Sequence, residues 1–530
     1  MFRALVAAAS VALASAQPVR ITINLPIVTH AIDERLYGQT VTGGIWGEAV
    51  RNRRFQESNA EGDWRVNDGV LECAGPDCRF RLDAPRNYEL SVEVRRPEGV
   101  AALLVGSVAV GHEDASWHNV RVRVEGDRAQ AWLDSLPLPA GVAAPALLGA
   151  RGGPAQFRAV AISTPGGRAL CSGVPLPARH WYATGPIDAA TDGHAFHVVT
   201  RDTNAIAAIQ QCGIAVRAGD TLRGMLRLRA PAPGLILRLL SGTQVIGSQT
   251  LGAATEVPLA IAPSATAPDA TLQLLLPRRA DLALEEVSLM SDSARAAGGF
   301  RPDLLQALAE LRPPILRWSA ENWKTAAFGV DQFLALAAKL RSQPVVSIPG
   351  SMSAQEAEEL ARYCEPRVKY VERRDKPLVS EWNASSALEA AGGLIGLEGE
   401  PGVAMAAPAP PSVIDFDRPW QITPAYAAVH LYRSHYASDV LQMKSDPGPL
   451  SAIATRTGDG RRIDVKLVNP APAAADIEVT LRGDFPILAA GLQILAGDAV
   501  RIASGPIERD GFTLRFRLPS RSIGIVALTR

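Results

Sequence analysis

The sequence carries no net charge, has few lysines and lacks a long apolar run after its first residues. Its 54 Lys and Arg side chains are balanced by 54 Asp and Glu, which gives no electrostatic support for a nucleic-acid or anionic-membrane partner. No segment after the N-terminus reaches the ~20 apolar residues that span a bilayer. We find no phosphate-binding loop, no Ser-His-Asp order and no cofactor fingerprint. We therefore expect no nucleic acid, no membrane and no cofactor.

Cysteines are also scarce, since the chain has five. Cys73 and Cys78 are close enough in sequence to close a small disulfide loop, and the odd total leaves at least one free thiol. Their C-x₄-C spacing has no second pair, so the sequence predicts no zinc site and no other metal site.

The chain is 530 residues long, which corresponds to three or four domains of the usual size. Hydrophobic residues make up 47% and charged residues 20%, which is a globular composition. The 39 prolines and 45 glycines suit many short strands joined by turns.

The first residues have the pattern of an export signal. A basic start is followed by an apolar stretch and then by Ala14-Ser15-Ala16 before Gln17, which predicts a signal peptide over 1–16. The alternative is an ordinary N-terminal helix. The signal predicts a secreted or periplasmic protein.

At about residue 301 the sequence changes from a pattern of strands alone to one in which helices alternate with strands. Strand-like alternation runs over 19–25 and through two long stretches, which predict β-sandwich modules at 57–175 and 176–293. The segment 36–55 indicates a strand, a glycine-rich turn and the start of a helix. Beyond 301, helices alternate with short strands, which is typical of parallel βα units. The predicted helices cover 302–311, 330–341 and 354–364, and the predicted strands cover 313–318, 344–348, 368–372 and 377–381.

Two glutamates close predicted strands of the βα region. Glu372 ends VKYVE and Glu381 ends PLVSE, and in a βα barrel catalytic groups stand at the carboxyl ends of strands. A pair of carboxylates is what glycoside hydrolysis requires. The alternative is that both are solvated rim residues.

Several stretches occur together in one family and in this order: LYGQTVTGGIWGEAVRNRRF (36–55), GIAVRAGDTLRGMLRLR (213–229), LEEVSLMSDS (284–293), RPDLLQALAELRPPILRW (301–318), LVSEWNA (378–384), GGLIGLEGEPGVAMAAPAP (392–410) and FDRPWQITPAYAAVHLYRSH (416–435). With them the chain resembles the secreted, multidomain α-L-arabinofuranosidases of glycoside hydrolase family 51. The resemblance implies a retaining mechanism in which Glu381 is the nucleophile. It also implies that Trp382 and Asn383 flank the sugar subsite, with Trp318 and Trp323 as further substrate-binding candidates.

The chain departs from that family at its proton donor. The family's acid/base is the last Glu of a W-E-I-G-N-E run, whereas VKYVE continues with Arg373-Arg374-Asp375-Lys376 and no Asn-Glu pair. Lys376 occupies the catalytic register, and Glu372 aligns with the first Glu of the run. Glu372 is therefore only a candidate acid/base, and the neighbouring arginines would hold it ionised. The family's Glu after the first-strand Y-G is also missing, because Gln39 follows here.

The predicted barrel is too short for eight strands. Eight βα units take about 250 residues, and four residues separate Glu372 from Pro377, fewer than a crossover helix needs. We expect an incomplete barrel of five or six strands with an open side. So short a connector favours an antiparallel hairpin, which would place the two glutamates at opposite ends.

The predicted fold class is a multidomain α/β plus β protein with a truncated (β/α) TIM-type barrel. Its predicted parts are a signal peptide (1–16), an N-terminal strand and first barrel unit (17–55), a β-sandwich (57–175), a carbohydrate-binding-like β-sandwich (176–293), an incomplete barrel (294–415) and a C-terminal β-sandwich (416–530). The predicted function is an arabinofuranosidase-like hydrolase of arabinose-containing polysaccharide, impaired by loss of its acid/base segment. The alternatives are a non-catalytic carbohydrate-binding relative and the product of a deleted or misassembled gene.

Four tryptophans of the β-sandwich modules have two interpretations. Trp64, Trp117, Trp132 and Trp181 either stack on sugar rings or fill the interiors of the sandwiches. Glu48 is expected to be structural, one turn into a helix, and Arg53 and Arg54 are expected to form ion pairs.

Overall fold

The computed structural model divides into two compact units, Met1–Ile45 with Asp303–Arg530 (unit 1) and Trp46–Pro302 (unit 2). It describes residues 17–75, 77–84, 87–95, 102–106, 108–110, 115–139, 141–167, 169–191, 195–201, 205–321, 323–324, 327–373, 377–416, 421–446, 448–496 and 501–530. The predicted signal peptide lies outside the described residues. None of the helices in the described part is long and apolar enough to cross a membrane.

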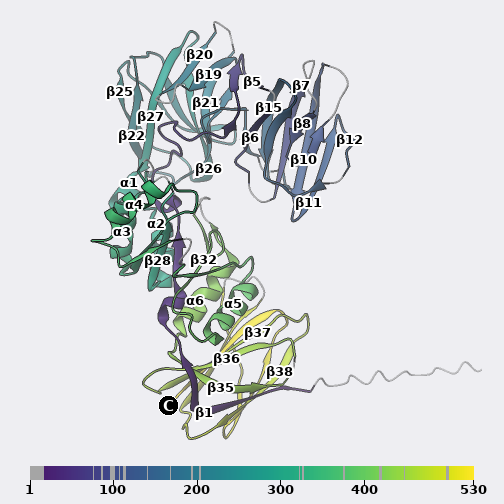
Figure 1. The fold of residues 1–530 in the computed structure, drawn as a ribbon, viewed down its shortest axis with the longest axis vertical. Coiled ribbons are helices and arrows are strands. Elements are labelled where there is room, and N and C mark those ends of the chain that lie inside the picture. The colour runs from purple at the N-terminus through teal and green to yellow at the C-terminus, as the bar shows by residue number, and fades with distance from the viewer. Residues whose placement is uncertain are drawn as a thin grey trace, which may run out of the picture. The chain divides into compact units, whose positions relative to one another are not determined.

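Six short strands in the described part of unit 1 form two all-parallel sheets, and two of these strands, β28 (Ile315–Ser319) and β32 (Ala406–Pro408), are labelled in Figure 1. Four form one sheet in the order β2 (Gln39–Val41), β28, β29 (Gln343–Ser347) and β30 (Tyr370–Glu372). The other two, β31 (Ser380–Trp382) and β32, form a separate parallel pair. The amide of Gly38 donates to the carbonyl of Ala406 at 3.0 Å, so the beginning of β2 lies beside β32. A side chain at position 38 would meet that carbonyl at 2.5 Å, so this approach requires glycine.

Three helices each precede one of these strands, a fourth joins β31 to β32, and the fifth follows all six strands. They are α2 (Pro302–Leu311), α3 (Val330–Leu340), α4 (Ala354–Cys364), α5 (Ala387–Gly399) and α6 (Pro424–Ser434). The predicted helices match α2 and α4 in their bounds and α3 within one residue. The cause is local: Pro302 opens α2, the Ser353 hydroxyl accepts from the Glu356 amide at 3.3 Å, and Arg341 ends α3 in the left-handed conformation.

The C-terminal β-sandwich of unit 1 also contains the N-terminal strand. Its sheet runs in the order β40 (Ala503–Gly505), β39 (Ala489–Ala496), β43 (Ser522–Thr529), β37 (Arg462–Asn469), β36 (Ser451–Arg456), β35 (Asp439–Ser445), β1 (Val19–Ala31), β38 (Ala475–Arg482), β42 (Thr513–Leu518), β41 (Glu508–Asp510). The sequence predicted a strand over 19–25 ahead of the first barrel unit, and this strand, β1, pairs antiparallel with β35 and parallel with β38. Its buried side chains, Ile21 and Ile23 among them, belong to the core of this sandwich.

Unit 2 is built from three sheets. The largest runs β12 (Leu136–Pro137), β11 (Arg128–Leu133), β10 (Trp117–Glu125), β7 (Tyr88–Arg95), β15 (Ala155–Ser163), β5 (Val70–Cys73), β4 (Trp64–Asn67), β19 (Ile187–Thr191), β20 (Phe196–Thr200), β27 (Asp281–Ser291), β22 (Leu222–Leu228), β25 (Glu256–Ile261), with β13 (Gly141–Val142) on β11 and β16 (Ala169–Ser172) on β15.

Each of the other two sheets covers one part of this long sheet. The first is β3 (Ala60–Glu61), β6 (Asp77–Arg81), β14 (Leu147–Arg151), β8 (Ala102–Val105), β9 (Val108–Val110), and the second is β17 (Val174–Pro175), β18 (Tyr182–Thr184), β21 (Ala207–Val216), β26 (Ala267–Leu276), β23 (Ile236–Ser241), β24 (Gln244–Thr250). Strands from 60 to 172 and from 174 to 291 therefore form two sandwiches that share one sheet through the pairing of Val66 with Ala189.

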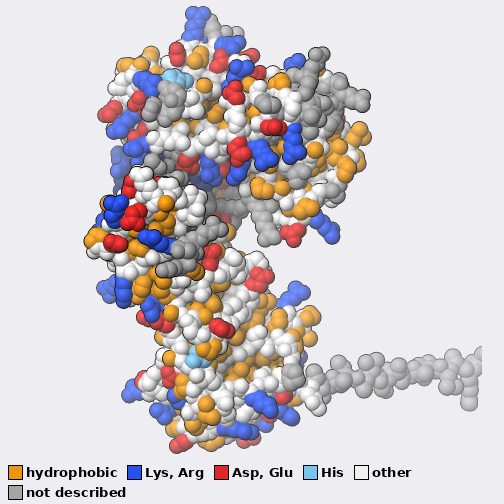
Figure 2. Space-filling model, viewed as in Figure 1, with side chains coloured by type: hydrophobic (Ala, Val, Ile, Leu, Met, Phe, Trp, Pro, Cys, Tyr) orange, Lys and Arg blue, Asp and Glu red, His pale blue; other side chains and the backbone are white. Residues whose placement is uncertain are grey.

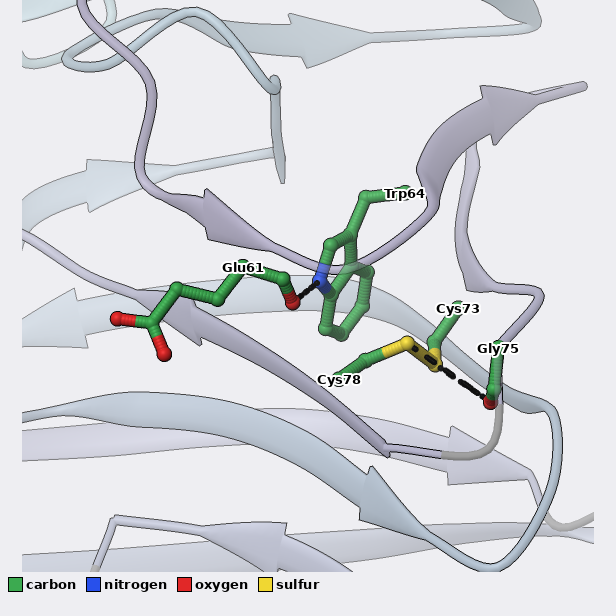
Figure 3. Close-up of a disulfide and its surroundings, with 5 residues drawn as sticks. All are labelled: Glu61, Trp64, Cys73, Gly75 and Cys78. Carbon is green, nitrogen blue, oxygen red and sulfur yellow. Dashed lines mark hydrogen bonds between the residues drawn. A yellow bond between two sulfur atoms is a disulfide. The ribbon is translucent and has the colours of Figure 1, made fainter.

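Two disulfides lie in unit 2. Cys73 and Cys78 are joined as predicted, beside Trp64, whose indole N–H donates to the Glu61 carbonyl at 3.1 Å (Figure 3). Cys171 and Cys212 form a second bridge, between β16 and β21. The fifth cysteine, Cys364, is a free buried thiol in unit 1, where burial raises its pKa to about 11 and leaves it unreactive.

The predicted helix within 36–55 is wrong. After β2 the chain forms 3₁₀ turn η2 (Gly43–Ile45), and Glu48 then bridges to Met290 in extended backbone. The Glu48 carboxylate accepts from the Ser288 hydroxyl at 2.6 Å and the Leu289 amide at 2.7 Å, contacts that a helix would not allow. Burial raises its pKa against these hydrogen bonds. The expected ion pairs are present, because Arg53 and Arg54 both lie within 3.6 Å of Glu286.

The remaining elements are short. They are 3₁₀ turn η1 (Glu34–Tyr37), helix α1 (Asp292–Ala296) and the hairpin of β33 (Ile414–Asp415) with β34 (Gln421–Ile422).

Candidate functional site

Successive side chains on the parallel strands of unit 1 point to opposite faces of the sheet. Ile315 on β28 packs with Val345, Val379, Met405 and Ala407 in a small apolar core. Because side chains on a strand alternate, Arg317 follows Ile315 onto the same face, and Glu381 follows Val379. The apolar core therefore supports a polar layer at the carboxyl ends of the strands.

Arg317 joins three side chains of that polar layer. Its Nε donates to Glu372 Oε2 at 2.8 Å, its Nη1 donates to Glu381 Oε2 at 2.6 Å, and its Nη2 lies 3.3 Å from Ser347 Oγ. These groups come from β28, β29, β30 and β31, so one guanidinium connects four strands. The sequence predicted both glutamates but not the cation between them. The alternation of Ile315 and Arg317 within the predicted strand 313–318 was the signal that could have identified it.

The two carboxylates differ in exposure. The Glu372 side chain is 5% exposed, whereas that of Glu381 is 47% exposed. Burial lowers the pKa of Arg317, but its pairing with Glu372 and Glu381 raises it by more, so the guanidinium stays charged. Both glutamates act as hydrogen-bond acceptors here, and only Glu381 is open to a solvent-borne substrate.

The expected antiparallel hairpin between the glutamates is wrong. β30 pairs only with β29 and β31 only with β32 among the described strands. Since each strand is held in a parallel pair of its own, the seven residues between them do not have to form a tight turn. Both glutamates reach the same guanidinium and hence the same end of the strands.

Trp318 is not a sugar platform. It is 3% exposed and packs against Phe328 and Phe333, with ring centroids 5.7 and 5.5 Å away. On β28 it alternates with Arg317 and therefore faces away from the polar layer. This corrects its prediction as a substrate-binding residue.

The other predicted binding residues surround the strand ends. Trp382 is partly buried and directly follows Glu381, and Asn383 is exposed. Trp323 lies beside Tyr363 with ring centroids 5.5 Å apart. The indole nitrogens of Trp382 and Trp323 are buried and have no hydrogen-bond partner among the described residues, and the same holds for the hydroxyl of Thr40, which is the register partner of Arg317.

The segment after Glu372 is described only in part. Arg373 lies 3.5 Å from Glu358, so among the described residues Arg317, rather than Arg373, pairs with Glu372. Arg374, Asp375 and Lys376 lie outside the described residues, as does Asn322.

The site has no metal-ligand cluster among the residues that the structure describes. On the face that Figure 2 shows, basic and acidic side chains are interspersed. Within the described part of the chain, no group of three or more His, Cys, Asp or Glu is arranged to hold a metal ion.

The comparisons with known proteins found similarity in structure. No protein-family model matches the chain, and no curated protein matches it. The solved structure of arabinose-bound MgGH51 α-L-arabinofuranosidase aligns over 96% of this chain and 100% of its own, with a TM-score of 0.53 and 13% identity. The arabinose complex of the α-L-arabinofuranosidase from Thermotoga maritima aligns over 44% of this chain and 90% of its own, with a TM-score of 0.38 and 14% identity. At these identities the first likeness shows the fold alone, which is a multidomain, β-rich fold shared with that protein.

Proposed function

We propose that this chain is an exported, glycoside hydrolase-like protein that binds arabinose-containing polysaccharide and cleaves it slowly by a retaining mechanism. The observation that carries the proposal is the Arg317 guanidinium, which orients the exposed Glu381 carboxylate at the carboxyl ends of parallel strands. Glu381 is the nucleophile. Trp382, Asn383 and Trp323 form the sugar subsite around it.

The six parallel strands constitute an incomplete TIM-type barrel in this proposal. Residues 373–379 join β30 to β31, where a complete barrel would have helices and strands. The alignment with a whole α-L-arabinofuranosidase supports the ancestry. The two disulfides support export, because such bridges persist in oxidising compartments.

Impairment follows from the state of Glu372. A retaining hydrolase needs a carboxylic acid that protonates the leaving oxygen, and Glu372 is buried and accepts a hydrogen bond from Arg317. We assign Glu372 to hold Arg317 rather than to donate a proton. Without a general acid, cleavage of an unactivated glycosidic bond slows by about 10²–10⁴-fold.

The same observation favours a second candidate function, a non-catalytic carbohydrate-binding protein. In that case the Arg317 cluster is a remnant that shapes a sugar-binding pocket, and Glu381 accepts hydrogen bonds from sugar hydroxyls.

The leaving group of the substrate separates the two functions. 4-Nitrophenolate departs without protonation, so 4-nitrophenyl α-L-arabinofuranoside should be cleaved while arabinan and arabinoxylan are cleaved far more slowly. Glu381→Gln should abolish nitrophenol release, and Glu365→Gln, at the exposed C-cap of α4, should leave it unchanged.

Each alternative outcome contradicts a part of the proposal. Equal rates on the activated and natural substrates would show that a proton donor exists and that impairment is wrong. No nitrophenol release, together with saturable binding of arabino-oligosaccharides, would establish the non-catalytic function. Release that survives Glu381→Gln would eliminate this nucleophile.

A further inference from the structure

The first sandwich of unit 2 has an open outer face. Its long sheet buries one face against β6, β14 and β8 in the main apolar core, through residues such as Val92 and Val122. The alternate side chains of β4, β5, β7, β10, β11 and β15 point the other way. We refer to these alternate side chains as the outer face.

Two of the four tryptophans lie on the outer face and two do not. Trp64 is 8% and Trp181 is 2% exposed, and both pack in the core. Trp117 and Trp132 are partly exposed. An arginine guanidinium stacks on each of these two indole rings. The guanidinium carbon of Arg158 lies 4.1 Å from the Trp117 ring centroid, and that of Arg121 lies 4.5 Å from the Trp132 ring centroid. The stacked guanidinium restrains each ring.

The spacing of the two rings suits an extended ligand. Trp132 pairs across the strands with Arg121, four residues beyond Trp117 on β10. Positions 117 and 121 of β10, level with the two tryptophans, are therefore separated by roughly 13 Å along the strand. Between them lie polar side chains that hydrogen-bond hydroxyl groups, including Asn119 and Ser91, whose side chains contact each other at 3.4 Å.

Arginine outnumbers glutamate on these six strands. The arginines are Arg65, Arg95, Arg121, Arg123, Arg128 and Arg158, and the glutamates are Glu72, Glu89, Glu93 and Glu125. The paired arginines are also the more exposed members, for example Arg121 at 48% over Glu89 at 21%.

In two of the ion pairs the arginine bonds its glutamate through Nε. Arg158 and Arg65 bond their glutamates through Nε, at 2.7 Å to Glu93 and 3.3 Å to Glu72. A guanidinium has five N–H donors, so the terminal nitrogens of these arginines are available for a planar anion such as a carboxylate.

We propose that the outer face binds a polysaccharide that carries uronic acid, with Trp117 and Trp132 stacking on sugar rings and Arg121 and Arg158 pairing with uronate carboxylates. This proposal extends the proposed function, since it names the charge class of the polysaccharide. The glutamates beneath the arginines disfavour the denser charge of a nucleic acid, and charge complementarity favours a chain with separated carboxylates.

The test uses the full chain and two matched probes. Binding to polygalacturonate and to the same polymer with its carboxyl groups reduced is measured by calorimetry at 50 and 500 mM salt. We expect at least tenfold weaker binding of the reduced polymer, and weakening of polygalacturonate binding at high salt because the contacts are solvent-exposed charges.

Variants connect the binding to the outer face. Trp117→Ala and Trp132→Ala should each weaken polygalacturonate binding about tenfold, and Arg121→Gln and Arg158→Gln about threefold to tenfold. Arg515→Gln is the control, because Arg515 is 49% exposed and paired with Glu478 in unit 1. Thermal unfolding of each variant identifies misfolding, and the arginine variants keep the test valid if a tryptophan variant fails to fold.

Three results would overturn the inference: equal binding of both polymers, binding that none of the four variants weakens, or equally tight binding of a single-stranded DNA. Nitrophenol release by the same variants separates this proposal from the proposed function. If a variant releases nitrophenol at the wild-type rate but binds polygalacturonate more weakly, the outer face is a site distinct from the strand-end site. If neither the wild type nor any variant releases nitrophenol, the result contradicts only the proposed hydrolase activity.

Discussion

The interiors of unit 1 and unit 2 are stabilised by different kinds of interaction. In unit 1, Lys466 on β37 is fully buried and its Nζ lies 2.5 Å from Glu398 Oε1, while the Tyr37 hydroxyl donates to the same oxygen. Two residues before Lys466, Asp464 is also fully buried and bonds His435 at 2.9 Å. Unit 2 instead has two disulfides and an aromatic core in which Phe55 contacts Trp181 and Phe196.

This difference shows where each unit is vulnerable. A buried ion pair contributes little when intact, but removing one partner leaves an uncompensated charge in the interior. A disulfide acts mainly by restricting the unfolded chain. Burial and the neighbouring carboxylate raise the pKa of Tyr37 well above its ordinary value, so its hydroxyl remains a donor to Glu398. Unit 1 should therefore be sensitive to charge deletion and unit 2 to reduction.

The largest effect is expected from Glu398→Ala. It leaves the Lys466 ammonium buried without its carboxylate, and the free energy of unfolding should fall by about 3–5 kcal/mol. Urea unfolding with hydrogen exchange read on β37 and α5 measures this. Glu400→Ala, at an exposed position two residues later, should change stability by less than about 0.5 kcal/mol.

A double variant sharpens the same test. Glu398→Leu with Lys466→Met removes both charges and should recover most of the lost stability, because apolar side chains of similar volume replace a buried pair at little cost. If the single variant is as stable as the wild type, the pair is not essential to unit 1.

Loss of the Cys171–Cys212 bridge should have the next largest effect, confined to unit 2. The bridge closes 41 residues, and replacing both cysteines by serine should reduce stability by about 2–4 kcal/mol. Hydrogen exchange should accelerate in peptides of 46–302 and remain unchanged in 303–530. Cys364→Ala is the control, because Cys364 forms no disulfide. Equal acceleration in both units would contradict the division between them.

The parts that could be predicted from the sequence are those set by local patterns. α2 and α4 were predicted to the residue because Pro302 and Ser353 act on their own turns. The position of β1 could not be predicted, because its partners β35 and β38 lie over 400 residues away. The helix expected after Gly44 was wrong for the same reason, since Glu48 bonds to residues 288 and 289 instead.

The candidate site shows the same limit. Glu372 and Glu381 were identified from their strand ends, and their exposure and shared cation depend on how four strands assemble. Trp318 was predicted as a binding residue because alternation alone does not reveal which face of β28 meets the helices. The position of Trp117 and Trp132 on an outer face likewise depends on long-range pairing.

Arg317→Met should cause an intermediate loss of stability. The same variant tests whether Arg317 positions Glu381 in the candidate site. Glu372 is 5% exposed and would lose its charged partner, so stability should fall by about 2–3 kcal/mol. Arg317→Met with Glu372→Gln should recover part of this loss in urea unfolding. Nitrophenol release should fall below the wild-type rate in both variants, because Glu381 is no longer oriented. Full activity in the single variant would mean that Arg317 does not position Glu381.

The smallest loss of stability is expected when the Cys73–Cys78 bridge of unit 2 is removed. It closes a separation of five residues, so the chain-entropy argument predicts a loss of about 1–2 kcal/mol for the double alanine variant, less than for Cys171–Cys212. Both cysteines are 1% exposed beside Trp64, so packing adds to the entropic contribution. Losses of equal size for the two bridges, measured by urea unfolding, would show that packing around the sulfur atoms, rather than loop length, determines how disulfides stabilise unit 2.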